Sequence, residues 1–108
     1  MSGFQFTPQA LGDLLDIWNF IARDNSEAAN RVEAAVLRAC GLLAASPLAG
    51  QIRADLSPLP LRFWVVQPYS NYLIVYDPGT EPLQIIEVLH GPRYSVSGEV
   101  ELLEQQVS

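Results

Sequence analysis

The residues best suited to chemistry gather in one short run, HGPRY, which holds the only histidine of the chain, His90. A histidine titrates near neutral pH and transfers protons. Arg93 can hold a phosphate or a carboxylate through paired hydrogen bonds, and Tyr94 can stack on a nucleobase or donate a hydrogen bond. With Arg62 nearby across a sheet, these residues would form a set able to cleave a phosphodiester bond.

The same residues have a structural interpretation, which the pattern alone favours. His90 can end a strand with its ring bonded to the backbone, Gly91 and Pro92 can form a turn, and Arg93 can pair with an acid. Glu87 would be a second group for proton transfer, but strict alternation along a strand places it on the face opposite His90. We therefore predict that Glu87 is solvated or ion-paired.

Other patterns typical of catalytic or ligand sites are missing from the sequence. A zinc site needs several cysteine or histidine ligands, and the chain has one of each. It contains neither a glycine-rich phosphate loop nor a nucleophile elbow. Cys40 and Trp18 fall on apolar helical stripes, so we predict both as core residues. We predict no metal and no cofactor.

The first half of the chain predicts two helices joined by a tight loop. Thr7 is a favourable N-cap followed by Pro8, a favourable first helical residue, and Ser26 is the predicted N-cap of the second helix. The many alanines of the second helix indicate a closely packed helical hairpin. The predicted buried stripe of the first helix comprises Leu11, Leu14, Leu15, Trp18, Ile21 and Ala22. That of the second comprises Ala28, Val32, Ala35, Val36, Ala39, Cys40 and Leu43.

The second half predicts three consecutive antiparallel strands at residues 61–67, 72–77 and 83–90, because short turn-rich segments separate them. Residues 4–6 predict a short first strand. Alternation divides the last strand into two faces, one with Ile86, Val88 and His90 and the other with Ile85, Glu87 and Leu89. The predicted fold is therefore α+β, an N-terminal helical hairpin packed on a small antiparallel β-sheet.

Length and composition indicate one globular domain over residues 1–94, followed by an acidic helix or tail at residues 95–108. The chain has six basic residues, all arginine, against twelve acids, for a formal net charge of -6. Such a chain repels a phosphate backbone at long range. The sequence predicts no signal peptide and no membrane span, and the lone cysteine fits a reducing cytoplasm.

Several segments taken in order resemble the RelE/ParE family of bacterial toxins from type II toxin–antitoxin modules. FQFTPQALGDLLDIWNFIA is similar to the family's first strand and helix, and LLAASPLAGQIR to the end of its second helix. YLIVY and VLHGPR are similar to its two final strands. The resemblance covers residues 4–94, and VLHGPR is closer to the ParE branch.

This resemblance implies a toxin held inactive by a co-expressed antitoxin, whose C-terminal segment wraps the helical hairpin and the sheet. The ParE branch poisons DNA gyrase, whereas the RelE branch cleaves mRNA in the ribosome with basic residues, a base and a stacking tyrosine. This chain has no lysine. It also has Tyr94 where the ParE branch more often has an acid or an amide.

Three functions remain open on the sequence. The first is a ParE-like toxin that binds its antitoxin and, when free, inhibits DNA gyrase without chemistry of its own. The second is a ribosome-dependent mRNA endoribonuclease that uses Arg62, His90, Arg93 and Tyr94. The third is a degenerate toxin that only binds antitoxin.

Overall fold

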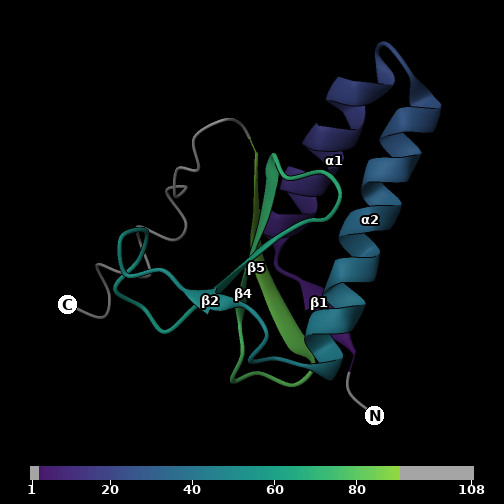
Figure 1. Cartoon of the computed structure of the whole chain (residues 1–108). Coiled ribbons are helices and arrows are strands. Elements are labelled where there is room, and N and C mark those ends of the chain that lie inside the picture. Colours follow the sequence, from purple (N-terminus) through teal and green to yellow (C-terminus); the bar gives the residue numbers. More distant parts are fainter. Residues whose placement is uncertain (1–2, 91–108) are drawn as a thin grey trace.

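The computed structural model describes residues 3–90, so the predictions for Arg93, Tyr94 and the acidic tail lie outside the described residues. Two helices cover one face of a five-stranded mixed sheet with the strand order β1-β5-β4-β3-β2 (Figure 1). The predicted α+β class is confirmed. The elements are β1 (Phe4–Phe6), α1 (Pro8–Ala22), α2 (Ser26–Ala45), β2 (Gln51–Ile52), β3 (Arg62–Val65), β4 (Tyr72–Asp77) and β5 (Leu83–His90).

Side-chain caps fix where the two helices begin. The Thr7 hydroxyl accepts a hydrogen bond from the Ala10 amide at 3.1 Å, and Pro8 occupies the first turn of α1, as predicted. The N-cap of α2 is Asn25, whose side-chain oxygen accepts from the Ala28 amide at 3.0 Å. The prediction of Ser26 was wrong by one residue, because asparagine is an equally good cap and precedes it.

The buried face of α1 is rotated from the predicted stripe. Ala10, Leu14 and Ile17 are buried, whereas Leu11 and Leu15 are 48% and 53% exposed, so the prediction was wrong for these two leucines. The other predicted stripe residues, Trp18, Ile21 and Ala22, are only partly buried. The helix is anchored to β5 through Thr7 and Asp13, which turns their side of the helix toward the sheet. The buried residues of α2 are Ala29, Val32, Ala35, Val36, Cys40 and Leu43. They match the predicted stripe except that Ala29 replaces Ala28 and that Ala39 is only partly buried.

The three predicted consecutive strands form an antiparallel meander, and β1 joins the sheet parallel to β5. The sheet is therefore mixed rather than purely antiparallel. A register shift between Val75 and Tyr76 pairs Val75 with Glu87 but Tyr76 with Ile85. This bulge breaks the strict alternation predicted for β5, since one extra residue changes which face a side chain occupies.

The bulge redistributes two isoleucines between the faces of β5. Ile85 joins Val88 in the core beneath the helices, and Ile86 joins Leu89 on the other face. The predicted faces were therefore wrong for Ile85 and Ile86. Glu87 lies opposite Val75 and is only 1% exposed, so the solvated alternative for it was also wrong.

Both faces of the sheet are covered, which explains why both are apolar. The helices bury one face, and the linker between β2 and β3 packs Leu56 and Leu59 against the other. That second cluster contains Leu61, Phe63, Leu73, Val75, Ile86 and Leu89. Within the described residues, no helix is long and apolar enough to cross a bilayer.

A buried tyrosine ties the turn after α2 to the sheet. The Tyr76 hydroxyl donates to the Pro47 carbonyl oxygen at 2.7 Å and accepts from the Gly50 amide at 2.8 Å. A Cβ atom at Gly50 would lie 2.5 Å from that hydroxyl and 3.0 Å from the Phe63 carbonyl oxygen. Only glycine therefore fits here without displacing the turn.

We expect Gly50→Ala to lower the free energy of unfolding by about 1–3 kcal/mol, because the added methyl group overpacks the site. Gly12→Ala is the matched control, since nothing lies within 4 Å of its Cβ position in α1. It should raise the free energy of unfolding by about 0.5–1 kcal/mol. Urea denaturation followed by tryptophan fluorescence measures both, and equal effects at the two glycines would contradict the close approach at Gly50.

Candidate functional site

Arg62, one of the four residues of the predicted phosphodiester-cleaving set, forms hydrogen bonds to the turn that follows α2. It begins β3, where its guanidinium donates to the carbonyl oxygens of Gly50 at 2.7 Å and Leu48 at 3.3 Å. These bonds stabilise the same turn that Tyr76 anchors. The observed role of Arg62 is thus to fix the turn after α2.

His90 lies at the far end of the sheet from Arg62. It ends β5 as predicted, is exposed, and pairs with Tyr72, their ring centroids 6.1 Å apart. Arg62 pairs with Tyr76, four residues along β4, and strands rise about 3.3 Å per residue. The structure therefore separates His90 from Arg62 by about 13 Å along the sheet and does not bring them into one site.

A small cavity of about 170 Å³ opens beside His90. Its lining combines apolar side chains from α1 with the ends of β4 and β5, namely Ile17, Phe20, Asn71, Tyr72 and His90. Partial burial raises the pKa of the Tyr72 hydroxyl, which keeps it protonated and able to donate. No arginine is among these lining residues. The cavity therefore has a largely apolar floor and no guanidinium group to bind a phosphate.

Asp13 is a partly buried carboxylate that was not among the predicted site residues. One oxygen accepts from the Val88 amide at 3.0 Å and the other from the Gln9 side-chain amide at 2.7 Å. Burial raises its pKa, opposed by the hydrogen bonds from Val88 and Gln9 and by the charge of His90. No spacing in the sequence links Asp13 to a strand amide 75 residues away. Its role is to join α1 to β5.

The outer side of the helical hairpin exposes three leucines. The Trp18 indole donates to the Asn30 side-chain oxygen at 2.9 Å, which sets the register of the two antiparallel helices. Leu11 lies seven residues before Trp18 on α1, and Leu37 lies seven residues after Asn30 on α2. A spacing of seven residues is two helical turns, so Leu11 lies on the same face of α1 as Trp18, and Leu37 lies on the same face of α2 as Asn30. Leu15 lies between Leu11 and Trp18 on α1.

We call Leu11, Leu15 and Leu37 the hairpin patch; they are 48%, 53% and 39% exposed. Spacings of three and four residues place helix side chains next to one another. The hairpin patch is therefore a continuous apolar strip on a rigid support. Sequence reasoning missed it because it assigned Leu11 and Leu15 to the core.

Cys40 and the acidic residues add no reactive centre to the described structure. Cys40 is fully buried in the core, where burial raises the pKa of its thiol to about 12, which confirms its assignment to the core. Over residues 3–90, no group of three or more histidine, cysteine, aspartate or glutamate side chains is arranged to hold a metal ion.

The fold defines the class of the molecule, since two helices packed on a five-stranded mixed sheet are consistent with a RelE/ParE-like toxin. The sequence model of the family described as "ParE toxin of type II toxin-antitoxin system, parDE" matches residues 4–93. The chain therefore belongs to the ParE toxin family. The resemblance found in the sequence is confirmed, including the closer likeness to the ParE branch.

A solved structure shares the fold. The structure described as "Chromosomal ParDE TA system from P. aeruginosa" superposes with a TM-score of 0.66 at 18% sequence identity. The alignment covers 83% of this chain and 96% of that chain. No curated protein sequence matches this chain.

Asp13 generates a prediction about stability and pH. Asp13→Ala should lower the free energy of unfolding by about 1–3 kcal/mol, because it leaves the Val88 amide without an acceptor. Asp13→Asn keeps an acceptor oxygen without the charge. Since burial raises the folded-state pKa of Asp13 above its ordinary value of 3.8, the folded wild type binds more protons there. The stability of the wild type relative to Asp13→Asn should fall as the pH rises through this titration.

Chemical denaturation at a series of pH values between about 3 and 7, a range that spans the ordinary aspartate pKa, measures these differences. A wild type that gains stability over Asp13→Asn as the pH rises would contradict a raised pKa.

Proposed function

We propose that this ParE-family toxin acts in the cytoplasm by binding proteins, with a cognate antitoxin as its neutralising partner and DNA gyrase as its target. The observation that carries this proposal is the hairpin patch. It presents apolar side chains on a surface that capped helices and a covered sheet hold in place. Such a surface suits recognition by another protein rather than chemistry on a small substrate.

The hairpin patch supports an antitoxin segment with apolar anchors. An amphipathic helix laid along it would supply side chains at spacings of three and four residues. Burial of apolar surface is worth about 25 cal/mol per Å², so covering three leucines adds several kcal/mol to association before ordering costs. The similar P. aeruginosa structure is described as a ParDE toxin–antitoxin system, which supports the same kind of partner.

The charge of the chain supports a basic partner segment. With a formal net charge of -6 and no lysine, the toxin attracts a positively charged antitoxin at long range. Attraction of this kind raises the rate of association and weakens with salt. The same charge opposes docking on ribosomal RNA, which favours gyrase over the ribosome as the target.

Within the described residues, no observation favours the ribonuclease alternative. Arg62 is committed to the Leu48 and Gly50 carbonyl oxygens, and His90 lies at the other end of the sheet. The remaining members of that set, Arg93 and Tyr94, lie outside the described residues. The degenerate alternative, a protein that only binds antitoxin, differs from our proposal in lacking toxicity.

Expression without the antitoxin should arrest growth and induce the DNA-damage response, because a poisoned gyrase leaves broken DNA. The purified toxin should inhibit DNA supercoiling by gyrase, and addition of antitoxin should restore it. Supercoiling that is unaffected at high toxin concentration would contradict the gyrase target. Cleavage of mRNA in a translation extract that is lost on His90→Ala would instead support the ribonuclease. Harmless expression together with intact antitoxin binding would support the degenerate toxin.

We expect Leu15→Glu to weaken antitoxin binding at least roughly tenfold, because it places a charge in the centre of the hairpin patch. Leu42→Glu is the matched control, since Leu42 is 48% exposed on α2. It lies five residues after Leu37, a spacing that places it on a different side of the helix. Leu42→Glu should change the affinity less than about twofold. Isothermal titration calorimetry with the co-expressed antitoxin measures both, and equal losses would contradict a role for the hairpin patch.

A further inference from the structure

Three aromatic rings meet at the end of the sheet that holds His90. Phe20 on α1, Tyr72 at the start of β4 and His90 at the end of β5 all line the cavity of about 170 Å³. The ring centroids of Tyr72 and His90 are 6.1 Å apart, and the two rings are tilted by 38°. Phe20 is 66% exposed. Its ring is therefore accessible to a ligand that enters the cavity.

Two carboxylates lie on the same side of α1 as Phe20. Asp16 lies four residues before Phe20 and Asp13 lies seven residues before it, and these spacings place helix side chains in one row. The charge of Asp16 raises the pKa of Asp13, and the charge of His90 lowers it, so the three groups are close enough to interact. The row therefore gives this side of the cavity two negative charges.

The ring of Phe20 already attracts a cation from its own chain. The guanidinium carbon of Arg23 lies 6.0 Å from the centroid of the Phe20 ring. A cation at about this distance is attracted by the negative face of an aromatic ring. Arg23 is exposed, and it forms no ion pair with another described residue. Its contact with Phe20 is therefore open to competition from a second cation.

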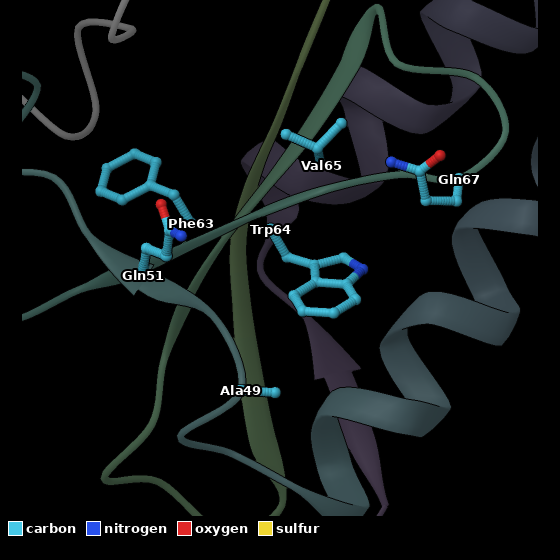
Figure 2. A pocket seen from close by; sticks show the side chains of 6 residues that line it. All are labelled: Ala49, Gln51, Phe63, Trp64, Val65 and Gln67. Atoms are coloured by element: carbon cyan, nitrogen blue, oxygen red, sulfur yellow. The ribbon is translucent and has the colours of Figure 1, made fainter.

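The larger cavity of the described structure, of about 270 Å³, does not combine these features. Figure 2 shows its two aromatic side chains, Phe63 and Trp64, on opposite sides of the strand, so their rings do not enclose one ligand. Every side chain that lines it is neutral, namely Ala49, Gln51, Phe63, Trp64, Val65 and Gln67. Paired rings beside a row of acids are found at the smaller cavity.

We propose that the cavity beside Phe20 receives an arginine side chain from the DNA-contacting surface of gyrase. The inference rests on the proposed gyrase target and specifies where the toxin contacts it. The planar guanidinium stacks on the rings of Phe20 and Tyr72, and the apolar stem of the arginine contacts Ile17. The exposed carboxylate of Asp16 supplies the opposite charge.

Charge and size favour this occupant. An enzyme that acts on DNA contacts the phosphates with lysine and arginine, so the surface that it offers to DNA is basic. The formal net charge of -6 attracts such a surface to the toxin at long range. Pockets for small molecules typically have volumes of about 300–1,000 Å³. A cavity of about 170 Å³ is better suited to a single side chain of a protein.

The cavity and the hairpin patch lie on different sides of α1. Phe20 lies five residues after Leu15 and nine after Leu11, which is about 140° and 180° around the helix. A helix with its side chains is about 10–12 Å across. An antitoxin bound to the hairpin patch therefore blocks the approach of a second protein to the cavity, although the two contacts use different residues.

Inhibition of DNA supercoiling by the full-length toxin tests the contact. Phe20→Ala should raise the toxin concentration needed for half inhibition at least roughly tenfold, because it removes one wall of the cavity. Leu48→Ala is the matched control, since Leu48 is 70% exposed in the turn after α2, at the Arg62 end of the sheet. It should change that concentration less than about twofold. Both variants should bind the antitoxin like wild type in isothermal titration calorimetry.

Two charge variants test the chemistry of the occupant. Asp16→Asn should weaken inhibition at least about threefold, because it removes the carboxylate that faces the guanidinium. Arg23→Gln should strengthen inhibition about twofold, because it removes the cation that competes for the Phe20 ring. A neutral apolar side chain in the cavity would leave both variants like wild type. That result would overturn the arginine.

Competition with DNA tests the surface of gyrase that is contacted. Duplex DNA without the toxin should occupy the same basic surface, so a saturating concentration should displace the toxin from immobilised gyrase. Toxin binding that saturating DNA leaves unchanged would overturn the DNA-contacting surface as the source of the arginine.

The outcomes separate this contact from the proposed function. Equal inhibition by wild type and Phe20→Ala would overturn the contact and leave gyrase as the target. A wild-type toxin that never inhibits supercoiling would overturn the target and the contact together. Loss of inhibition in Phe20→Ala and Asp16→Asn, with a gain in Arg23→Gln and intact antitoxin binding in all three, would support the proposal.

Discussion

Burial of Tyr76 is the constraint on which much of the structure depends. The register shift beside it places its ring, with Ile85, in the core beneath the helices. Its hydroxyl then fixes Pro47 and Gly50, so the chain must leave α2 in a tight turn. Because Ala49 is bonded back to Ser46 in that turn, it does not continue β2 opposite Val65. β2 therefore covers only the first half of β3, as a consequence of the way the core is closed.

A second constraint acts on the opposite edge, where side chains replace a missing strand. β1 is only three residues long, and the hydrogen bonds from Thr7 and to Asp13 satisfy β5 beyond it. Burial at this position removes water from the Asp13 carboxylate and raises its pKa. The bond that Asp13 accepts from Val88 in turn orients α1 on the sheet. That orientation buries Ile17 and turns Leu11 and Leu15 outward. The hairpin patch is therefore a consequence of how α1 is anchored.

Local signals in the sequence were sufficient for most of the fold. Thr7 and Pro8 predict the start of α1, and the turn-rich segments predict the meander, because these features act over a few residues. The rotation of α1 depends on a bond between Asp13 and Val88, and the faces of β5 depend on a bulge. Neither has a local pattern.

The candidate site was predictable to a similar extent. The end of the last strand at His90 was predicted correctly, since the alternating pattern of the apolar run and its length determine where the strand ends. The distance between His90 and Arg62 depends on the register of three strands, which the residue types do not specify. The hairpin patch was missed because its leucines were assigned by residue type alone. A leucine on a helix is assigned to the core by default, and only the packed structure shows which leucines remain outside.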